Sequence, residues 1–332
     1  MFHFINDKHS FLLIRKLNCV VLILTSIINF SIQVFTMNIA FCINRLALIG
    51  LGVTVTSLIR NCADTKKLKI FFLCADLKEE DTQQLTLLLA DEKFKGQHFF
   101  KHFKPFVEFG NLCSLMGDWT AYGRLLLSDL ISEVDSILYM DADLVVELDV
   151  LQVSNFDLGD HPIAAVYGSE IKHALDHKFL IDYCQLTAEG THFNSGILLM
   201  NLSLWRTQKL KEVCLEFANK YPDQLLSHDQ TILNALFSKS ILLLPAAFNV
   251  PWCAFELQPR ITEKLILHFT GSPKPWDIGG KFIHNGYAKW HSYLNKGWSD
   301  AYGKRSLQDL VRAWNIKRSY IRTVKRKFTK TL

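Results

Sequence analysis

The sequence predicts an α/β fold in which helices cover both faces of a mainly parallel β-sheet. Short, wholly apolar segments alternate along the chain with longer amphipathic segments, as strands alternate with helices in parallel sheets. Apolar residues make up 49% of the 332 residues and charged residues 21%. That composition supports a large packed core and argues against a disordered chain.

The apolar segments and the amphipathic segments follow one another in a regular order. In the first half, strands are predicted at residues 38–43, 69–74 and 136–140, and helices at residues 47–60, 81–94 and 118–130. In the second half, strands are predicted at residues 162–167, 196–200 and 264–268, and helices at residues 204–220 and 229–237. No repeat and no Pro/Gly linker divides these elements, so we expect one domain over residues 37–303.

The segment before the first predicted strand has two interpretations. Residues 17–35 are apolar enough to suggest a membrane anchor, and basic residues precede them. However, polar residues such as Asn18 and Asn29 interrupt this segment, and the strand follows without a linker. Met37 stands directly before that strand. We therefore interpret residues 1–36 as an upstream extension, and a signal anchor is the alternative.

The other end of the chain is strongly basic. Residues 304–332 contain ten Lys and Arg residues, and Asp309 is the only acid among them. Apolar and aromatic side chains, such as Trp314, Ile321 and Phe328, recur among these charges near helical spacing. We predict a basic helical tail that binds an anionic membrane surface. The alternatives are a helix packed on the domain, and nucleic-acid binding, which is disfavoured because no recognised module accompanies the charge.

The eight cysteines are scattered, and no Cys-x-x-Cys pair occurs. This spacing argues against a zinc site. It is typical of reduced thiols in the core of a cytosolic protein.

Two carboxylates follow the apolar strand at residues 136–140. Asp141 and Asp143 flank Ala142 at the end of that strand. On an extended chain, residues two apart point the same way, so both carboxylates are predicted to grip one divalent cation. Hard cations such as Mg²⁺ or Mn²⁺ prefer carboxylate and phosphate oxygens, and such an ion can bridge a diphosphate. The alternative is a solvated turn whose acids cap a helix.

A second candidate cluster follows the strand at residues 264–268. His268 ends that strand, and it is either a third metal ligand or a buried core histidine. Gly271 permits close backbone approach, and Lys274 supplies a positive charge for phosphate. The segment therefore suggests a diphosphate clamp, although a purely structural loop fits the spacing equally well.

Amides and hydroxyls form a third candidate group. Asn194 and Ser195 are expected just before a buried strand, where they suit sugar hydroxyls. Asp229 and Gln230 are expected in the first turn of a helix that Ser227 caps. The alternative interpretation is that these residues only cap a turn and a helix.

Together these segments resemble glycosyltransferase family 8, especially its bacterial lipopolysaccharide core glucosyl- and galactosyltransferases. The resemblance covers roughly residues 37–290. It rests on four segments in order: Leu138-Tyr-Met-Asp-Ala-Asp143, Phe193-Asn-Ser-Gly-Ile-Leu-Leu-Met-Asn-Leu202, His228-Asp-Gln-Thr-Ile-Leu-Asn234 and His268-Phe-Thr-Gly-Ser-Pro-Lys-Pro-Trp276. The resemblance implies a GT-A fold. It also implies retaining transfer of a hexose from a UDP-sugar, UDP-glucose or UDP-galactose, with Mn²⁺ (or Mg²⁺).

The resemblance also implies a role for each candidate residue. Matched to the family's segments, the metal ligands are Asp141, Asp143 and His268, and the diphosphate contacts are Gly271 and Lys274. The other donor-binding residues are Asn44, Arg124, Asn194 and Ser195, and the residues at the reacting sugar are Asp229 and Gln230. Gln230 matches the residue beneath the anomeric carbon. Because an amide is a poor nucleophile, attack on the same face as departure fits better than a covalent intermediate.

The chain departs from the family pattern after its first strand. The family commonly has an acid there, followed by an Asn or Tyr that holds uridine. This chain has Asn44, which can hydrogen-bond, and then Leu46, which cannot. In addition, the acid expected after the strand at residues 162–167 is displaced, and Glu170 is the nearest candidate.

The resemblance also suggests partners and a location. A lipid-linked oligosaccharide acceptor at the inner face of a bacterial plasma membrane would fit the basic tail. Two other functions compete: a metal-dependent nucleotidyltransferase and a catalytically silent membrane-associated binding protein. The presence of Asp141, Asp143 and His268 together argues against the silent protein.

Overall fold

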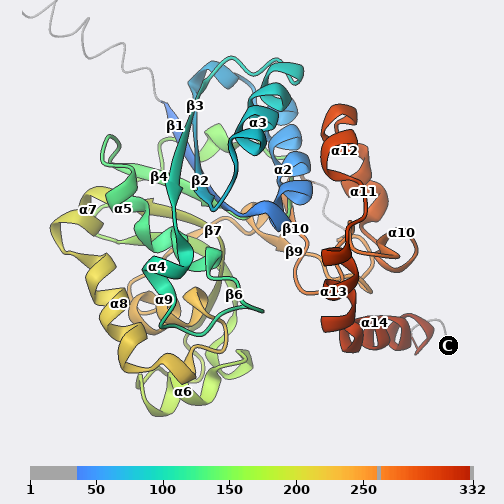
Figure 1. Ribbon diagram of the computed structural model, residues 1–332. Coiled ribbons are helices and arrows are strands. Elements are labelled where there is room, and N and C mark those ends of the chain that lie inside the picture. The colour runs from blue at the N-terminus through green and yellow to red at the C-terminus, as the bar shows by residue number, and fades with distance from the viewer. Residues whose placement is uncertain (1–35, 260–262, 330–332) are drawn as a thin grey trace, which may run out of the picture. The chain divides into compact units, whose positions relative to one another are not determined.

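The computed structural model describes residues 36–259 and 263–329, without the side chains of residues 328 and 329. Its main sheet has seven strands in the order β3-β2-β1-β4-β7-β6-β8 (Figure 1). Their bounds are β1 (Met37–Ile43), β2 (Leu68–Ala75), β3 (Gln97–Phe103), β4 (Ser136–Met140), β6 (Ile163–Glu170), β7 (Thr191–Asn201) and β8 (Leu242–Leu244). Only β7 runs antiparallel to its neighbours, so the prediction of a mainly parallel sheet is confirmed.

The order of the strands reverses between β1 and β4. From β1 the chain moves through β2 to β3 on one side, and it then returns to form β4 on the other side of β1. Ligands in open α/β sheets bind beyond the carboxyl ends of the strands at such a reversal. Because β7 is antiparallel, its first residues lie at this same edge.

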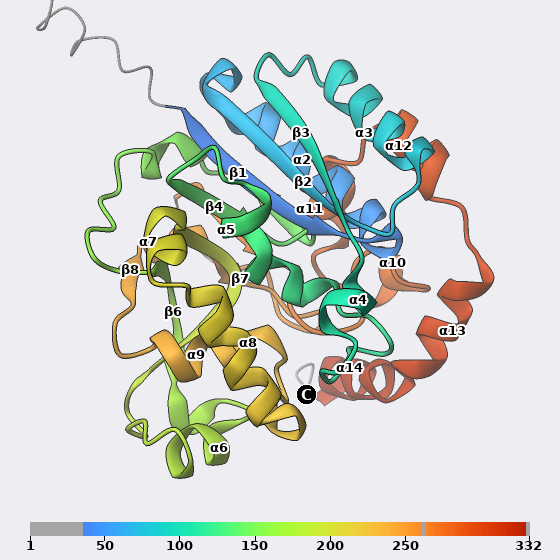
Figure 2. The ribbon, with the colours of Figure 1, turned by 60° about the vertical axis from the view of Figure 1, so that its left-hand side comes forward.

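Helices cover both faces of the sheet (Figure 2). On one face, α2 (Leu48–Asn61) and α3 (Glu79–Asp91) pack on side chains such as Ile39 and Phe72. On the other face, side chains such as Phe71 and Leu198 meet α5 (Leu127–Leu130), α7 (Leu202–Thr207), α8 (Leu210–Lys220) and α9 (Asp229–Phe237). Successive strand residues point to opposite faces, which explains why the central strands are almost wholly apolar.

A second, three-stranded sheet connects the carboxylate segment with the histidine segment. Its strands are β5 (Leu144–Val146), β10 (Ile266–His268) and β9 (Val250–Pro251). Helix α2 satisfies the backbone of β5 with polar side chains: the Thr54 hydroxyl lies 3.0 Å from both Leu144 N and Leu144 O. The Ser57 hydroxyl accepts from Val146 N at 2.9 Å. Buried backbone groups need such partners, so α2 fixes the position of β5.

The C-terminal part of the described chain is helical. Its helices are α10 (Gly280–Ile283), α11 (Tyr287–Ser292), α12 (Lys296–Tyr302), α13 (Leu307–Asn315) and α14 (Lys317–Thr329). Trp298 of α12 is buried against α2, where its indole N–H donates to Leu48 O at 2.9 Å. Two short helices elsewhere complete the fold: α4 (Pro105–Phe109) and α6 (His177–Asp182). Among residues 36–259 and 263–329, no helix is both long enough and apolar enough to cross a lipid bilayer.

Four expectations about elements are corrected. Residues 118–130 form mainly a 3-10 helix, Thr120–Leu126, in which Gly123 lies close to Cys42 of β1. The helix predicted at residues 204–220 is two helices, broken where Lys209 has a φ of 53°. Asn194 and Ser195 lie inside β7 rather than before a strand. The basic tail forms two helices, α13 and α14, that break at Ile316.

The predicted domain boundaries stay predictions. Of residues 1–36, only Thr36 is described, so the interpretation of that segment lies outside the described residues. The side chain of Phe328 and residues 330–332 of the tail also lie outside them. The residues from Met37 onward form one compact unit.

Candidate active site

The two aspartates lie where the chain passes from the main sheet to the small sheet. Asp141 follows β4, and its N–H donates to Gly196 O of β7 at 2.8 Å. The chain then bends, and β5 begins one residue after Asp143. The expectation that both aspartates lie on an extended strand is therefore wrong. The bend, together with the two sheets that flank it, brings their carboxylates toward one another.

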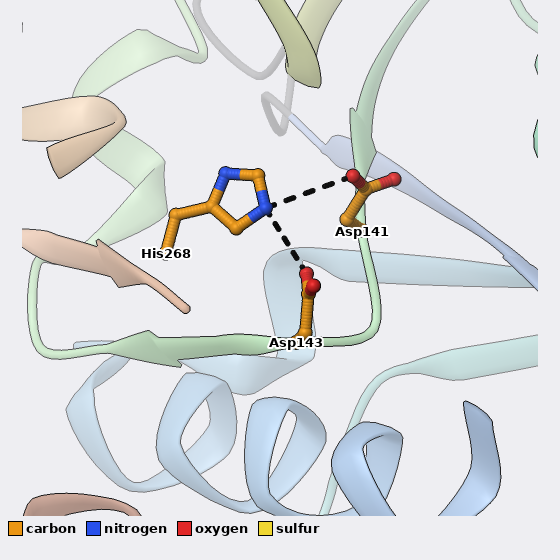
Figure 3. Close-up of side chains that lie close together, drawn as sticks. All are labelled: Asp141, Asp143 and His268. Atoms are coloured by element: carbon orange, nitrogen blue, oxygen red, sulfur yellow. Dashed lines mark ion pairs between the residues drawn. The ribbon is translucent and has the colours of Figure 1, made fainter. Parts of the chain in front are cut away.

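His268 completes a cluster with these aspartates, as Figure 3 shows. Its Nε2 lies 3.1 Å from Asp143 Oδ1 and 3.8 Å from Asp141 Oδ2. One ligand atom from each of the three residues lies within 4.8 Å of the other two. Since β10 pairs with β5 residue by residue, with His268 opposite Leu144, the register of the small sheet fixes this meeting.

The side chains in this cluster fit a divalent cation. Asp143 Oδ1 is buried and has no hydrogen-bond partner among the described residues, although His268 lies beside it. Asn249 Nδ2 donates to Asn194 Oδ1, so Asn249 Oδ1 is free to accept from His268 Nδ1 at 3.0 Å. The proton of His268 then sits on Nδ1, and the lone pair of Nε2 faces the two carboxylates. Metal-binding histidines are oriented in this way.

Lys274 lies beside the same cluster. Its Nζ is 2.5 Å from Asp143 Oδ2 and also donates to Phe269 O. Burial alone would raise the pKa of Asp143, but the Lys274 ammonium holds that pKa well below its ordinary value. Asp143 is therefore ionised. Its neighbours are the Lys274 ammonium and the His268 imidazole, which could bind a metal ion. This is the environment that a diphosphate and its metal ion require.

Arg124 links the cluster of Asp141, Asp143 and His268 to the residues that are predicted to lie at the reacting sugar. It is buried, and its guanidinium lies 3.1 Å from both Asp141 Oδ1 and Asp229 Oδ2. The guanidinium also donates to Ser195 O and stacks over the Tyr139 ring at 4.3 Å. Burial alone would lower the pKa of Arg124, but Asp229, Tyr139 and Asp141 hold it above its ordinary value. In this structure Arg124 holds two carboxylates in place, and its predicted contact with the donor stays a prediction.

The predicted sugar-binding residues form one hydrogen-bonded group. The Ser195 hydroxyl donates to Asp229 Oδ2 at 2.9 Å. Gln230 Oε1 accepts from Asn194 Nδ2 at 3.0 Å and from Ser195 N at 3.1 Å. Burial raises the pKa of Asp229 despite the nearby Arg124. The oxygen of Gln230 is thus held by β7, which orients its amide nitrogen as a donor.

The local backbone at Asp229 differs from the expectation. Ser227 does not cap α9; the residue before the helix is His228, which has a φ of 56°. The Ser227 N–H instead donates to Thr231 Oγ1 at 3.0 Å. Asp229 is turned into the core, where Arg124 and Ser195 hold its carboxylate.

Three further candidates lie outside these hydrogen bonds. Asn44 lies at the carboxyl end of β1, where its Oδ1 accepts from Ala47 N and its Nδ2 donates to Asp118 Oδ2 at 2.6 Å. Gly271 lies in the loop after β10 and has a φ of 70°, a conformation that favours glycine. Glu170 forms an ion pair with Lys172 at 2.8 Å at the end of β6.

Comparison with known protein families decides what kind of protein carries this site. The model described as Glycosyl transferase family 8 matches residues 38–278, which is most of the chain.

The chain belongs to glycosyltransferase family 8.

This family 8 enzyme is similar to several curated proteins. It is 26% identical over 256 residues to "Lipopolysaccharide 1,2-glucosyltransferase" of Escherichia coli K12, covering 72% of each chain. It is 26% identical over 259 residues to "Lipopolysaccharide 1,3-galactosyltransferase" of Salmonella typhimurium, covering 74% of each chain. It is 29% identical over 199 residues to "General stress protein A" of Bacillus subtilis, covering 53% of this chain and 68% of that protein.

Solved structures share the fold of this family 8 enzyme. The galactosyltransferase LgtC, solved with donor and acceptor sugar analogs, matches with a TM-score of 0.66 at 22% identity. The match covers 78% of this chain and 95% of LgtC. GlyE of Streptococcus pneumoniae matches with a TM-score of 0.57 at 22% identity, covering 80% of this chain and 62% of GlyE. The predicted GT-A fold is therefore confirmed.

Three residues of the site were missed from the sequence. Tyr139 donates its hydroxyl to Asp141 Oδ1 at 2.7 Å, although the sequence suggests only an apolar strand there. Asn249 orients His268, and no strand was predicted near it. Gly196 makes room for the cluster, because a Cβ on it would lie 2.3 Å from His268 Cε1. For Tyr139 and Gly196, the available signal was a polar or a small residue within a buried strand.

Proposed function

We propose that this family 8 enzyme transfers a hexose, glucose or galactose, from UDP-glucose or UDP-galactose to a saccharide acceptor with retention of configuration. The observation that carries the proposal is the meeting of Asp141, Asp143 and His268 beside Lys274, at the carboxyl edge of the sheet. Of the divalent ions that fit this cluster, Mn²⁺ (or Mg²⁺) agrees best with oxygen-rich ligands and a diphosphate.

The residues around the cluster have different roles in the proposed transfer. A bound metal ion would act as a Lewis acid that stabilises the negative charge on the leaving diphosphate. Lys274 places its ammonium beside Asp143, where it can also contact the phosphate oxygens. Asp229 and Gln230 lie on α9, linked to the metal ligands through Arg124 and Asn194.

Retention, which is proposed from the family, would here proceed without a covalent intermediate, because of the chemistry of the two residues predicted to lie nearest the reacting sugar. The Asp229 carboxylate is held by Arg124 and Ser195 in the core, so it is poorly placed to attack a sugar carbon. Gln230 offers an amide, which is a weak nucleophile. Transfer on one face of the sugar, with the acceptor attacking as the diphosphate departs, needs neither residue to form a covalent bond.

The acceptor is proposed to be a lipid-linked oligosaccharide, such as the lipopolysaccharide core, at the inner face of a bacterial plasma membrane. Two relatives are named lipopolysaccharide glucosyl- and galactosyltransferases, which supports this class of acceptor. The exposed side of α13 also supports it, since Leu307, Leu310, Val311 and Trp314 recur there at helical spacing. Basic residues surround this stripe, as in helices that lie on anionic membranes.

A donor screen tests the proposed function. The protein is incubated with UDP-glucose, UDP-galactose and GDP-mannose, each with Mn²⁺ or with EDTA, and the release of nucleotide and of sugar is measured. We expect slow hydrolysis of one UDP-hexose in Mn²⁺, an α-configured sugar as the first product by proton NMR, and little release in EDTA. Release of pyrophosphate would support the nucleotidyltransferase instead, and a β-configured first product would exclude retention.

A further inference from the structure

The loop that carries Lys274 is held from both sides. On the catalytic side, Lys274 Nζ contacts Asp143 and Phe269 O. On the other side, the Lys274 backbone N–H donates to Asp277 Oδ2 at 2.7 Å. The Asp277 carboxylate is 4% exposed, so it is removed from water and depends on protein partners.

The main partner of Asp277 comes from the basic tail. Arg312 of α13 binds it with two hydrogen bonds, from Nε to Oδ1 at 2.7 Å and from an Nη to Oδ2 at 3.2 Å. A two-bond arginine–carboxylate contact fixes direction as well as distance. The orientation of Asp277, and with it the Lys274 N–H, therefore depends on the position of α13.

Two other residues of the tail bind the same loop. Arg305 donates to Trp276 O at 2.8 Å, and the Tyr320 hydroxyl of α14 donates to Ile278 O at 2.7 Å. A cavity of about 430 Å³ lies between α13 and this loop, lined by Ile278, Gly279, Arg305, Ser306, Leu307 and Leu310. Since this gap interrupts the packing there, polar contacts provide much of the connection between α13 and the loop.

We propose that Asp277 is a positioning residue for Lys274 and that Arg312 holds Asp277 in its working orientation. The inference rests on the proposed function, in which Lys274 binds the diphosphate of the donor. Asp277 itself touches no reacting atom. Its part is to fix the backbone of Lys274, so that the ammonium reaches the diphosphate when a donor is bound. The basic tail thereby contributes to donor binding as well as to any membrane contact.

The first experiment measures the affinity for UDP in Mn²⁺ by calorimetry. We expect Arg312→Ala to weaken binding about tenfold and Arg312→Lys to weaken it less, because lysine keeps the charge but loses the second hydrogen bond. The matched control is Arg60→Ala, which removes the two 2.8 Å hydrogen bonds between Arg60 and Glu92. That pair lies where α2 and α3 end, at the opposite edge of the sheet, so UDP affinity should stay unchanged.

The second experiment asks whether Arg312 acts through Lys274. In a Lys274→Ala background, Arg312→Ala should change UDP affinity less than about twofold, because two residues of one network are not additive. Amide exchange of residues 274–280, measured without ligand by mass spectrometry, should speed up in Arg312→Ala but not in Arg60→Ala. If Arg312→Ala fails to fold, UDP affinity and amide exchange are measured on Arg312→Lys and Tyr320→Phe instead.

The outcomes separate this inference from the proposed function. If Arg312→Ala binds UDP within twofold of the wild type, the inference is overturned and the proposed function is not. The same holds if Arg312→Ala weakens UDP binding by its full factor in the Lys274→Ala background. A wild-type protein that neither binds UDP nor hydrolyses a UDP-sugar removes the proposed function, and the inference with it. A loss confined to melting temperature, with unchanged affinity, makes Arg312 a purely structural residue and also overturns it.

Discussion

At the scale of single residues, Asp143 has the most demanding position in the molecule. It is largely buried, it pairs with Lys274 through one oxygen, and its other oxygen faces His268 without a hydrogen bond. A buried carboxylate with one unpaired oxygen is costly unless a cation completes its surroundings. The structure therefore accounts for Asp143 as a metal ligand better than as a residue of a turn.

Asp143→Asn tests this role with little change in shape. The amide keeps the size of the side chain but loses the charge that binds a divalent cation. Because Lewis-acid stabilisation is worth several kcal/mol, we expect donor hydrolysis to fall about a thousandfold, or ~4 kcal/mol. Circular dichroism should show an unchanged fold. Turnover within about threefold of the wild type would remove Asp143 from the metal site.

Gly196 is a second residue with a role that depends on size. A Cβ there would lie 2.3 Å from His268 Cε1 and 2.8 Å from Asp141 Oδ2, closer than side chains approach one another. We expect Gly196→Ala to displace both ligands, to weaken the activating affinity for Mn²⁺ about tenfold, and to destabilise the fold by ~1–3 kcal/mol. Activity titrated with Mn²⁺ and a thermal melt measure the two effects.

Gly297→Ala is the control for that substitution. Its Cβ would lie 3.4 Å from Asp91 Oδ2, an ordinary contact, and Gly297 is within helix α12. We expect unchanged Mn²⁺ affinity and equal or slightly greater stability. If Gly196→Ala behaved in the same way, the account of the close packing around His268 would be wrong.

The residues of the site were predictable to different degrees. Asp141, Asp143 and His268 were predictable because each follows an apolar strand, and strand ends in α/β sheets meet at one edge. Tyr139, Asn249 and Gly196 act through contacts between segments distant in sequence, which spacing along one chain does not reveal. Asp277 was missed for the same reason, since its partner Arg312 was interpreted only as part of a basic surface.

At the scale of elements, α13 has two sides with different surroundings. One side carries Arg312, which binds Asp277 of the catalytic domain. The other side exposes Val311 and Trp314, and the Trp314 side chain is covered in part by Lys317 at 3.7 Å from its ring. The alternative interpretation, packing on the domain, describes the side that carries Arg312, and the predicted membrane contact of the other side stays a prediction.

Substituting the exposed side alone tests the proposed membrane contact without disturbing Arg312. We expect Val311→Ser with Trp314→Ser to weaken binding to anionic liposomes at least tenfold, because burying each large apolar side chain is worth ~1.5–3 kcal/mol. Binding by the wild type should also weaken with salt. Donor hydrolysis in solution should stay the same.

Leu175→Ser with Tyr183→Ser is the matched control, since both residues are exposed apolar side chains near α6, on a different part of the surface. This control should bind liposomes like the wild type. Equal binding by all three proteins would count against a membrane role for α13.

The elements were predictable where the chain is buried on both faces, and less so elsewhere. The central strands β1, β2 and β4 were predicted because, after a single polar residue near the start of each, they are apolar. Strand β3 was missed because it lies at the edge of the sheet and carries polar residues such as Gln97 and Lys101. Strands β5 and β9 have three and two residues, too few to show a pattern.

At the scale of the whole molecule, the site depends on segments that lie far apart in the sequence. The main sheet supplies Asp141 and, through β7, Asn194 and Ser195. The small sheet supplies His268, and the loop after it supplies Lys274. The strand order explains why these residues meet, because the order of the strands reverses between β1 and β4.

The central claim is that this convergence makes a metal-dependent site for a nucleoside diphosphate sugar. Calorimetry of UDP binding to the full chain, in Mn²⁺ and in EDTA, tests it most directly, with Asp143→Asn measured beside the wild type. We predict that removing the metal weakens UDP binding to the wild type at least tenfold, or ~1.4 kcal/mol, and that Asp143→Asn binds equally weakly with or without Mn²⁺. Equal affinity of the wild type in Mn²⁺ and EDTA, or a Mn²⁺ effect that survives in Asp143→Asn, would contradict the account.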